Sequence, residues 1–265
     1  MSEDSKKEYP RPSLTADVVV VALGAKGGLR VLFIERARPP FQGAWALPGG
    51  FVEPGETVGQ AAARELMEET SLDDVRIDEL GCFSKPGRDP RGWVVSVAHL
   101  ATVSADRLGQ VKAGDDAAAA AWLDLTVEAG GGFRLEREGK LVHHGGSLGD
   151  AGAATHGTLA FDHGDIIATA VQRLRDRVGE LAFELLPQPF KLSAARGAFE
   201  AILGEPVDPE VFERVLRDGM VRAVTLPARP GGLGESRYVP TPQRRSPWLL
   251  LGQDDPGRPG SSPDR

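Results

Sequence analysis

The sequence is poor in cysteine and in long apolar stretches. Its 265 residues include one cysteine, so no disulfide can form within the chain, which fits a reducing cytoplasm. It has no run of about 18 apolar residues, the length that a membrane-spanning helix needs. The charged start also has none of the apolar segment typical of a secretory signal. We therefore expect a cytoplasmic protein with no membrane partner.

An excess of positive charge is missing as well. The formal net charge is −7, which argues against a chain that coats nucleic acid along its whole length. Residues 190–245 are the less acidic part, with 9 Lys and Arg against 7 Asp and Glu. The composition therefore leaves room for a small basic module, although this part is only weakly basic.

Apolar runs and glycine-rich turns predict an α/β fold in the first half. β-Branched runs alternate with turn residues, and one segment has helical spacing of its apolar residues with no proline inside it. Strands before and after this helix are typical of an α/β/α sandwich around a mixed sheet. We predict strands at 17–24, 29–35, 44–47, 75–83, 93–103 and 120–125, a helix at 57–70, and an inserted hairpin at 133–144.

The second half predicts a smaller unit. An amphipathic helix is expected within 159–177, and two short helices and a hairpin follow, which is the outline of a winged helix-turn-helix. Ser193 and Asp208 are expected to cap these two helices, and Gly204 to end the first. The predicted organisation is a disordered tail at 1–14, an α/β domain at 15–145, a glycine-rich linker at 146–158, the helix and winged unit at 159–240, and a disordered tail at 241–265.

Three glutamates gather on the helix predicted at 57–70. Glu65, Glu68 and Glu69 are spaced i, i+3 and i+4, so they share one helix face. Like charges this close repel, and a divalent cation such as Mg²⁺ would relieve the repulsion, because it prefers carboxylate oxygens. A bound metal could polarise a phosphoryl group and activate a water. The alternative is a solvated acidic face with no ligand.

This segment resembles the catalytic helix of the Nudix hydrolases. The resemblance implies metal ligation by Glu56, Glu65, Glu68 and Glu69, with Arg64 orienting a glutamate, and Mg²⁺ or Mn²⁺ as the cofactor. It also implies hydrolysis of the pyrophosphate in a nucleoside diphosphate derivative, ADP-ribose-like in this case. The matching residues are Gly50, Glu56, Arg64, Glu65, Leu66, Glu68, Glu69 and Leu72.

Ser71 is the one departure from that pattern, where the family has glycine. The glycine ends the helix in a left-handed conformation. We expect serine there to be strained by on the order of 1 kcal/mol, or to shift the cap slightly. Because serine at this position removes no metal ligand, we expect it to affect stability and not metal binding.

Arginines and a glycine loop are the candidates for binding the substrate. Arg88 and Arg91 join two predicted strands and could bind phosphate or ribose, or could be solvated arginines of a plain turn. Arg36 and Arg38 end a strand that faces the loop leading to Gly49 and Gly50, which are further candidates. Asp115 or Asp116 could serve as a general base. His143, His144, His156 and His163 are interpreted as solvated linker residues, with metal binding as the alternative.

The second half resembles that of the Nudix-related transcriptional regulators of NAD metabolism. The resemblance is carried by residues 159–167, 181–187 and 199–204 within 15–240. It implies a homodimer, an ADP-ribose-type effector and binding of double-stranded DNA. The candidate DNA-binding residues are Arg196, Arg214, Arg217 and Arg237.

The helix expected to enter the DNA groove is acidic, however. Asp208, Glu210 and Glu213 lie on it, and phosphate contacts supply most non-specific DNA affinity. A winged unit kept for packing or dimerisation is therefore an equal alternative. Of the two functional hypotheses, hydrolase comes first, because the acidic ligands are all present, and ADP-ribose-responsive regulator second.

Overall fold

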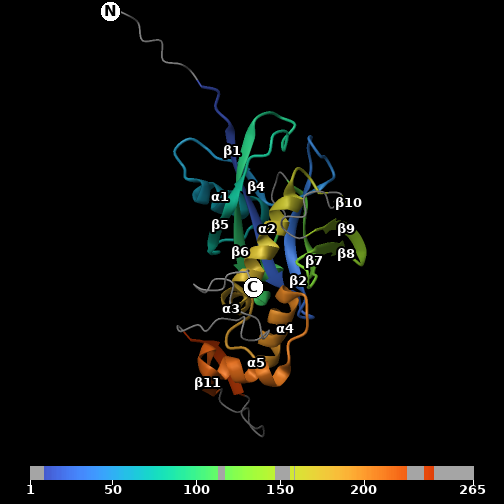
Figure 1. Cartoon of the computed structure of the whole chain (residues 1–265). Coiled ribbons are helices and arrows are strands. Elements are labelled where there is room, and N and C mark those ends of the chain that lie inside the picture. The colour runs from blue at the N-terminus through green and yellow to red at the C-terminus, as the bar shows by residue number, and fades with distance from the viewer. Residues whose placement is uncertain (1–8, 113–116, 147–155, 158, 226–235, 242–265) are drawn as a thin grey trace, which may run out of the picture.

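One large mixed sheet organises the protein (Figure 1). A computed structural model describes residues 9–112, 117–146, 156–157, 159–225 and 236–241. The path through the sheet is β10-β9-β8-β7-β2-β1-β6-β5, with β1 and β6 parallel, β3 paired to β2 and β4 to β1. Its strands are β1 (Ser13–Leu23), β2 (Leu29–Arg36), β3 (Trp45–Ala46), β4 (Gly49–Phe51), β5 (Ile77–Phe83), β6 (Val94–Val103), β7 (Ala117–Val127), β8 (Phe133–Arg137), β9 (Lys140–Gly145) and β10 (His156–Gly157).

The helices cover both faces of this sheet, which confirms the predicted sandwich. Side chains alternate along β1, so Val18 and Val20 pack with Ala61 and Leu66 of α1 (Val58–Thr70). Val19 and Val21 belong to the core of the other face. That face is covered by α2 (His163–Asp176), α3 (Val178–Glu184) and α4 (Leu192–Leu203).

The predicted hairpin at 133–144 is confirmed as β8 and β9. It extends the main sheet, because β8 pairs with β7. The predicted linker also contributes β10 to the edge, next to β9. A short 3₁₀ helix (Ala105–Gln110) follows β6. The single cysteine, Cys82, is exposed, although a free cysteine is more often buried.

The C-terminal unit has the predicted order of two helices and a hairpin. α4 ends at Gly204, which is left-handed with φ 76°. α5 (Pro209–Val215) begins with Asp208 as its cap, whose side chain accepts from the N–H of Val211 at 2.9 Å. A π-helical turn (Leu216–Met220) leads into β11 (Val221–Thr225), which pairs with β12 (Ser236–Pro240). The predicted cap at Ser193 is wrong, since α4 already begins at Leu192.

The C-terminal unit packs directly on the sheet. Phe199 of α4 and Phe212 of α5 are fully buried in the same hydrophobic core as Val19 and Phe33. Arg175, in the last turn of α2, donates to the carbonyls of Leu203 and Ala129 and so ties α2, α4 and the β7–β8 turn together. Within the described residues, no helix is long and apolar enough to cross a membrane.

Ser71 adopts the left-handed cap conformation expected of glycine. Its φ is 59° and its ψ 18°, and its N–H donates to the carbonyl of Met67 at the end of α1. We expect Ser71→Gly to stabilise the protein by about 1 kcal/mol, because glycine adopts this conformation without strain. Chemical denaturation should show the gain as a higher midpoint with unchanged slope, and Ser71→Ala should show no gain.

Candidate active site

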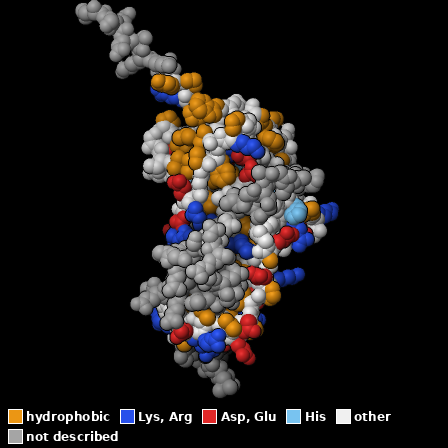
Figure 2. All heavy atoms as spheres, viewed as in Figure 1, with side chains coloured by type: hydrophobic (Ala, Val, Ile, Leu, Met, Phe, Trp, Pro, Cys, Tyr) orange, Lys and Arg blue, Asp and Glu red, His pale blue; other side chains and the backbone are white. Residues whose placement is uncertain are grey.

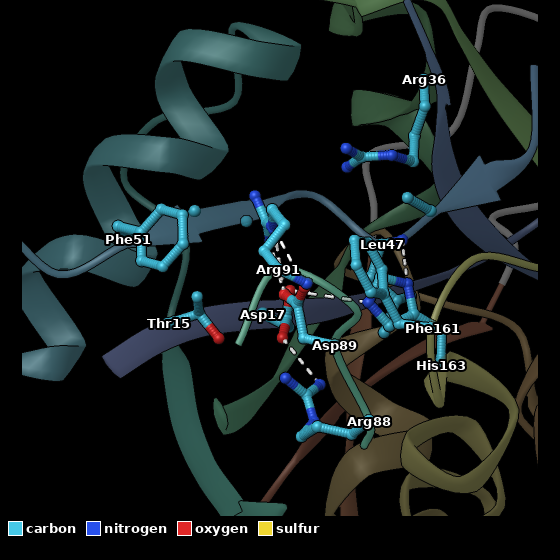
Figure 3. A pocket seen from close by; sticks show the side chains of 13 residues that line it. Thr15, Asp17, Arg36, Leu47, Phe51, Arg88, Asp89, Arg91, Phe161 and His163 are labelled. Atoms are coloured by element: carbon cyan, nitrogen blue, oxygen red, sulfur yellow. Dashed lines mark hydrogen bonds and ion pairs between the residues drawn. The ribbon is translucent and has the colours of Figure 1, made fainter. Parts of the chain in front are cut away.

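A pocket lies where β1, the end of β2, the β5–β6 loop and the segment entering α2 meet (Figure 3). The space between these elements, including the part that is open to solvent, is about 410 Å³. In Figure 3 the pocket is surrounded by Arg36 from β2, Arg88 and Arg91 from the β5–β6 loop, and Phe161 and His163 from the segment entering α2. The lining residues are Thr15, Asp17, Arg36, Ala46, Leu47, Gly49, Gly50, Phe51, Arg88, Asp89, Arg91, Phe161 and His163.

Arg64 organises the glutamates of α1 beside this pocket. Its guanidinium contacts Glu56 at 2.8 Å, Glu65 at 2.8 Å and Glu68 at 3.3 Å, and it also donates to the carbonyl of Phe51. The hydrogen bonds from Arg64 lower the pKa of Glu56. The structure thus places Arg64 against three of the candidate metal ligands.

Glu69 is turned away from Arg64 and toward the pocket loop. Its Oε2 accepts from the N–H of Gly49 at 2.8 Å. Burial, with the nearby charges of Glu65 and Asp17, raises the pKa of Glu69 to about 8. Burial also raises the pKa of Glu65. Two carboxyl groups thus share a site that disfavours their negative charge.

These carboxylates suit a divalent cation in their chemistry. The neighbouring acids Glu65 and Glu69 would gain from a positive partner, and oxygen donors are what Mg²⁺ prefers. In the part of the chain that the structure describes, no three acidic, histidine or cysteine side chains converge as a ready-made ligand set. Arg64 holds the oxygens of Glu56, Glu65 and Glu68, so metal binding would have to rearrange these contacts.

Glycine is required at positions 49 and 50 because neighbouring atoms leave no space for a Cβ. A Cβ on Gly50 would lie 2.2 Å from Oε1 of Glu65, and a Cβ on Gly49 would lie 2.3 Å from the carbonyl oxygen of Ala16. The loop can therefore pass between β1 and α1 only without side chains at these positions.

The pocket arginines differ in what already neutralises them. Arg88 is buried and pairs with Asp162 through two hydrogen bonds of 2.9 and 2.6 Å. Arg91 pairs with Asp89 at 2.6 Å. Arg36 contacts the Phe161 ring, 4.9 Å from its centroid, and donates to the carbonyl of Pro40.

Arg36 is the pocket arginine left for an anion. Among the described residues no carboxylate is within ion-pair distance of it. Burial and the charge of Arg91 lower its pKa, while the charges of nearby acidic residues act in the opposite direction. An anionic group placed beside Arg36 would further favour its charged form. Arg38 is exposed and does not line the pocket, so the structure does not bring it together with the other candidates.

Sequence and fold both match known proteins. The family model described as NUDIX domain matches residues 13–133. The fold is similar to the crystal structure of a MutT/nudix family protein from Enterococcus faecalis, with 32% identity, a TM-score of 0.76 and 90% of each chain covered. The chain belongs to the Nudix family.

Two Nudix relatives differ in what their names describe. The "ADPR responsive transcriptional repressor NtrR" of Acinetobacter baylyi is 29% identical over 226 residues, which are 83% of this chain and 79% of the relative. The "ADP-ribose pyrophosphatase" of Methanocaldococcus jannaschii is 43% identical over 117 residues, 44% of this chain and 64% of the relative. Similarity to the repressor thus extends well beyond the length of the NUDIX match.

Sequence reasoning missed several residues of this pocket, among them Asp17, Phe161 and His163. Asp17 was assigned only to a strand, yet it is 7% exposed and accepts from the hydroxyl of Ser96. An acid within an apolar run predicted to be buried was the available signal. Phe161 and His163 lie in the segment 159–167 that carried the second resemblance, but no role in the pocket was assigned to them.

The interpretation of the histidines as solvated linker is wrong for two of them. His163 is 2% and His143 is 4% exposed, because the segment after the linker returns to the sheet. There the N–H of Ala160 donates to the carbonyl of Trp45. His144 is exposed. The side chain of His156 lies outside the description, as do Asp115 and Asp116, the candidate bases.

Proposed function

We propose that this chain is a Nudix hydrolase that cleaves the pyrophosphate of an ADP-ribose-like nucleoside diphosphate derivative. The observation that carries the proposal is the complete set of glutamates on α1, with Glu69 hydrogen-bonded to the loop of a pocket that contains Arg36. The relative named ADP-ribose pyrophosphatase supports the substrate class. A cytoplasmic location, expected from the single cysteine, belongs to the same proposal.

Glu56, Glu65, Glu68 and Glu69 would hold the cofactor, Mg²⁺ or Mn²⁺. When bound, it would offset phosphate charge and lower the pKa of a water. Arg64, which contacts three of these glutamates without metal, would orient one of them once the metal has rearranged those contacts. Glu69 would fix the backbone of Gly49 beside the phosphates.

The substrate would be bound by the pocket arginines, the glycine loop and two aromatic rings. Arg36 would contact the diphosphate, while Arg88 and Arg91, already paired with Asp162 and Asp89, would shape the wall. The Phe51 and Phe161 rings, each within 6 Å of the Arg91 guanidinium, provide surfaces for a base or ribose. Gly49 and Gly50 would allow the substrate to approach the backbone, and Arg38 would contribute only from outside the pocket.

Removing the side chain of Arg36 should weaken substrate binding. We expect Arg36→Ala to raise KM for ADP-ribose about tenfold or more, because charge-assisted hydrogen bonds contribute roughly 1.5–3 kcal/mol. Steady-state kinetics with Mg²⁺ would measure this. Arg30→Ala is the control, since Arg30 is on the same strand and pairs with Asp124 on the surface. An unchanged KM would show that Arg36 does not meet the ligand.

A nucleotide hydrolysis panel tests the function itself. The purified chain is incubated with ADP-ribose, other nucleoside diphosphate derivatives and either Mg²⁺ or Mn²⁺, and the products are separated by chromatography. We expect AMP from ADP-ribose only when metal is present. If no substrate is turned over with either metal, the proposed hydrolase function is refuted.

A DNA-binding regulator that responds to ADP-ribose is the second candidate. It is favoured by the α4–α5 and β11–β12 arrangement and by similarity to the repressor over 83% of this chain. Arg196, Arg214, Arg217 and Arg237 are the proposed DNA contacts, and a homodimer is proposed with them.

The charge of the C-terminal unit argues against the regulator hypothesis. Arg196 faces Glu200 at 3.6 Å and Arg217 faces Glu213 at 3.1 Å. On the face in Figure 2, acidic and basic side chains are mixed over the lower part of the molecule. A gel shift with the upstream DNA of its own operon decides the point. Specific binding that falls with salt and changes with ADP-ribose supports regulation, and purely non-specific binding refutes it.

A further inference from the structure

The pocket is completed by a segment beyond the NUDIX match. Phe161 and His163 line it, whereas the match covers residues 13–133. His163 is the first residue of α2 and reaches back toward β1 and the loop at Leu47 (Figure 3). The site that binds the ligand therefore includes the helix that leads to the C-terminal unit.

Three elements hold the loop at three consecutive residues. The N–H of Leu47 donates to Nδ1 of His163 on α2 at 2.9 Å. The carbonyl of Pro48 accepts from Val18 on β1 at 2.8 Å, and the N–H of Gly49 donates to Glu69 on α1 at 2.8 Å. The contact with His163 is buried, so losing it leaves the N–H of Leu47 without water or a partner.

His163 is itself held in one orientation. It is fully enclosed, and its Nε2 faces Oδ1 of Asp17 at 3.7 Å. Asp17 in turn accepts from Ser96. The preceding residue, Asp162, is fixed by Arg88 through two hydrogen bonds. The imidazole therefore cannot turn from the loop unless the start of α2 moves.

We propose that His163 is a positioning residue of the ligand site, through which α2 holds the 47–50 loop and the Glu69 that binds it. The inference rests on the proposed function, because it concerns the same pocket. Since coupling is reciprocal, a ligand that binds the ordered loop also stabilises the position of α2.

Two substitutions at His163 separate the hydrogen bond from the packing. Asparagine offers an acceptor oxygen near the position of Nδ1, whereas leucine fills the space without one. We expect His163→Leu to raise KM for ADP-ribose about five- to thirtyfold, with a smaller change in kcat, because the ligand must reorder the loop. His163→Asn should restore most of the affinity. His144→Leu, at an exposed histidine outside the pocket, is the control and should match the wild type.

Hydrogen exchange without ligand tests the positioning independently of turnover. The amides of Leu47 and Gly49 should exchange faster in His163→Leu than in His163→Asn or the wild type. If no ADP-ribose binds to the wild type, the proposed function fails while this comparison still decides the positioning. Equal exchange and equal KM in both variants would overturn the inference. If His163→Leu does not fold, His163→Gln, whose longer side chain displaces the acceptor, replaces it in both measurements.

Discussion

Glu69→Gln should abolish hydrolysis while leaving the fold intact. The amide oxygen can still accept from the N–H of Gly49, so the loop contact at 2.8 Å survives. The charge that would bind the metal is lost, and we expect kcat/KM for ADP-ribose to fall at least about 100-fold, beyond the effect typical of residues that only support metal ligands. Assays with Mg²⁺ and with Mn²⁺ measure the loss.

We expect the stability of Glu69→Gln, unlike its activity, to be unchanged. Burial raises the pKa of Glu69 to about 8 in the metal-free protein, so replacing this carboxyl with a neutral amide should not lower Tm. Glu138→Gln, at an exposed turn, controls for the loss of one charge. Full activity in Glu69→Gln would remove this residue from the catalytic set, and a large fall in Tm would show that its role is structural.

Alanine substitutions at the neighbouring residues Gly49 and Gly50 should have different effects. In Gly50→Ala the new Cβ meets the carboxylate of Glu65 at 2.2 Å, and this side chain can move aside. In Gly49→Ala it meets the backbone oxygen of Ala16 at 2.3 Å, which cannot move without distorting β1. We expect Gly50→Ala to lose activity with little change in stability, and Gly49→Ala to lose about 2–3 kcal/mol of unfolding free energy.

Denaturant unfolding and turnover, measured on both variants, test this pair. Displacing Glu65 should also weaken binding of Mn²⁺ in Gly50→Ala, which titration calorimetry can follow. Gly59→Ala is a suitable control, because nothing lies within 4 Å of its added Cβ. Equal stability of the two variants would contradict the assigned close contacts.

The parts of the fold with local signals were predictable from the sequence. Spacing alone placed Glu65 and Glu69 on one face, and the left-handed Ser71 followed from the glycine that normally ends this helix. Asp208 followed by proline gave the start of α5 correctly. In each case the residues that determine the structure are within a few positions of one another.

The pocket depended on contacts between distant residues, and there sequence reasoning was limited. Arg88 was a candidate for binding phosphate or ribose, or a solvated turn residue, but its partner Asp162 is 74 residues away. No local pattern indicates that pair. His163 was assigned to a linker because glycine surrounds it in sequence, whereas its environment is set by Leu47, 116 residues away. Burial of such groups becomes visible only when the sheet brings the segments together.

The hydrophobic core that joins the sheet to α2, α3, α4 and α5 limits how the two halves can move. Phe199 and Phe212 are buried in the same core as Val19, and packed interiors of this kind do not deform continuously. A hinge that swings the C-terminal unit as a free body would have to expose this surface. Any response of that unit to the pocket would instead take the form of shear, with α2 sliding slightly against β1 while the helices stay packed.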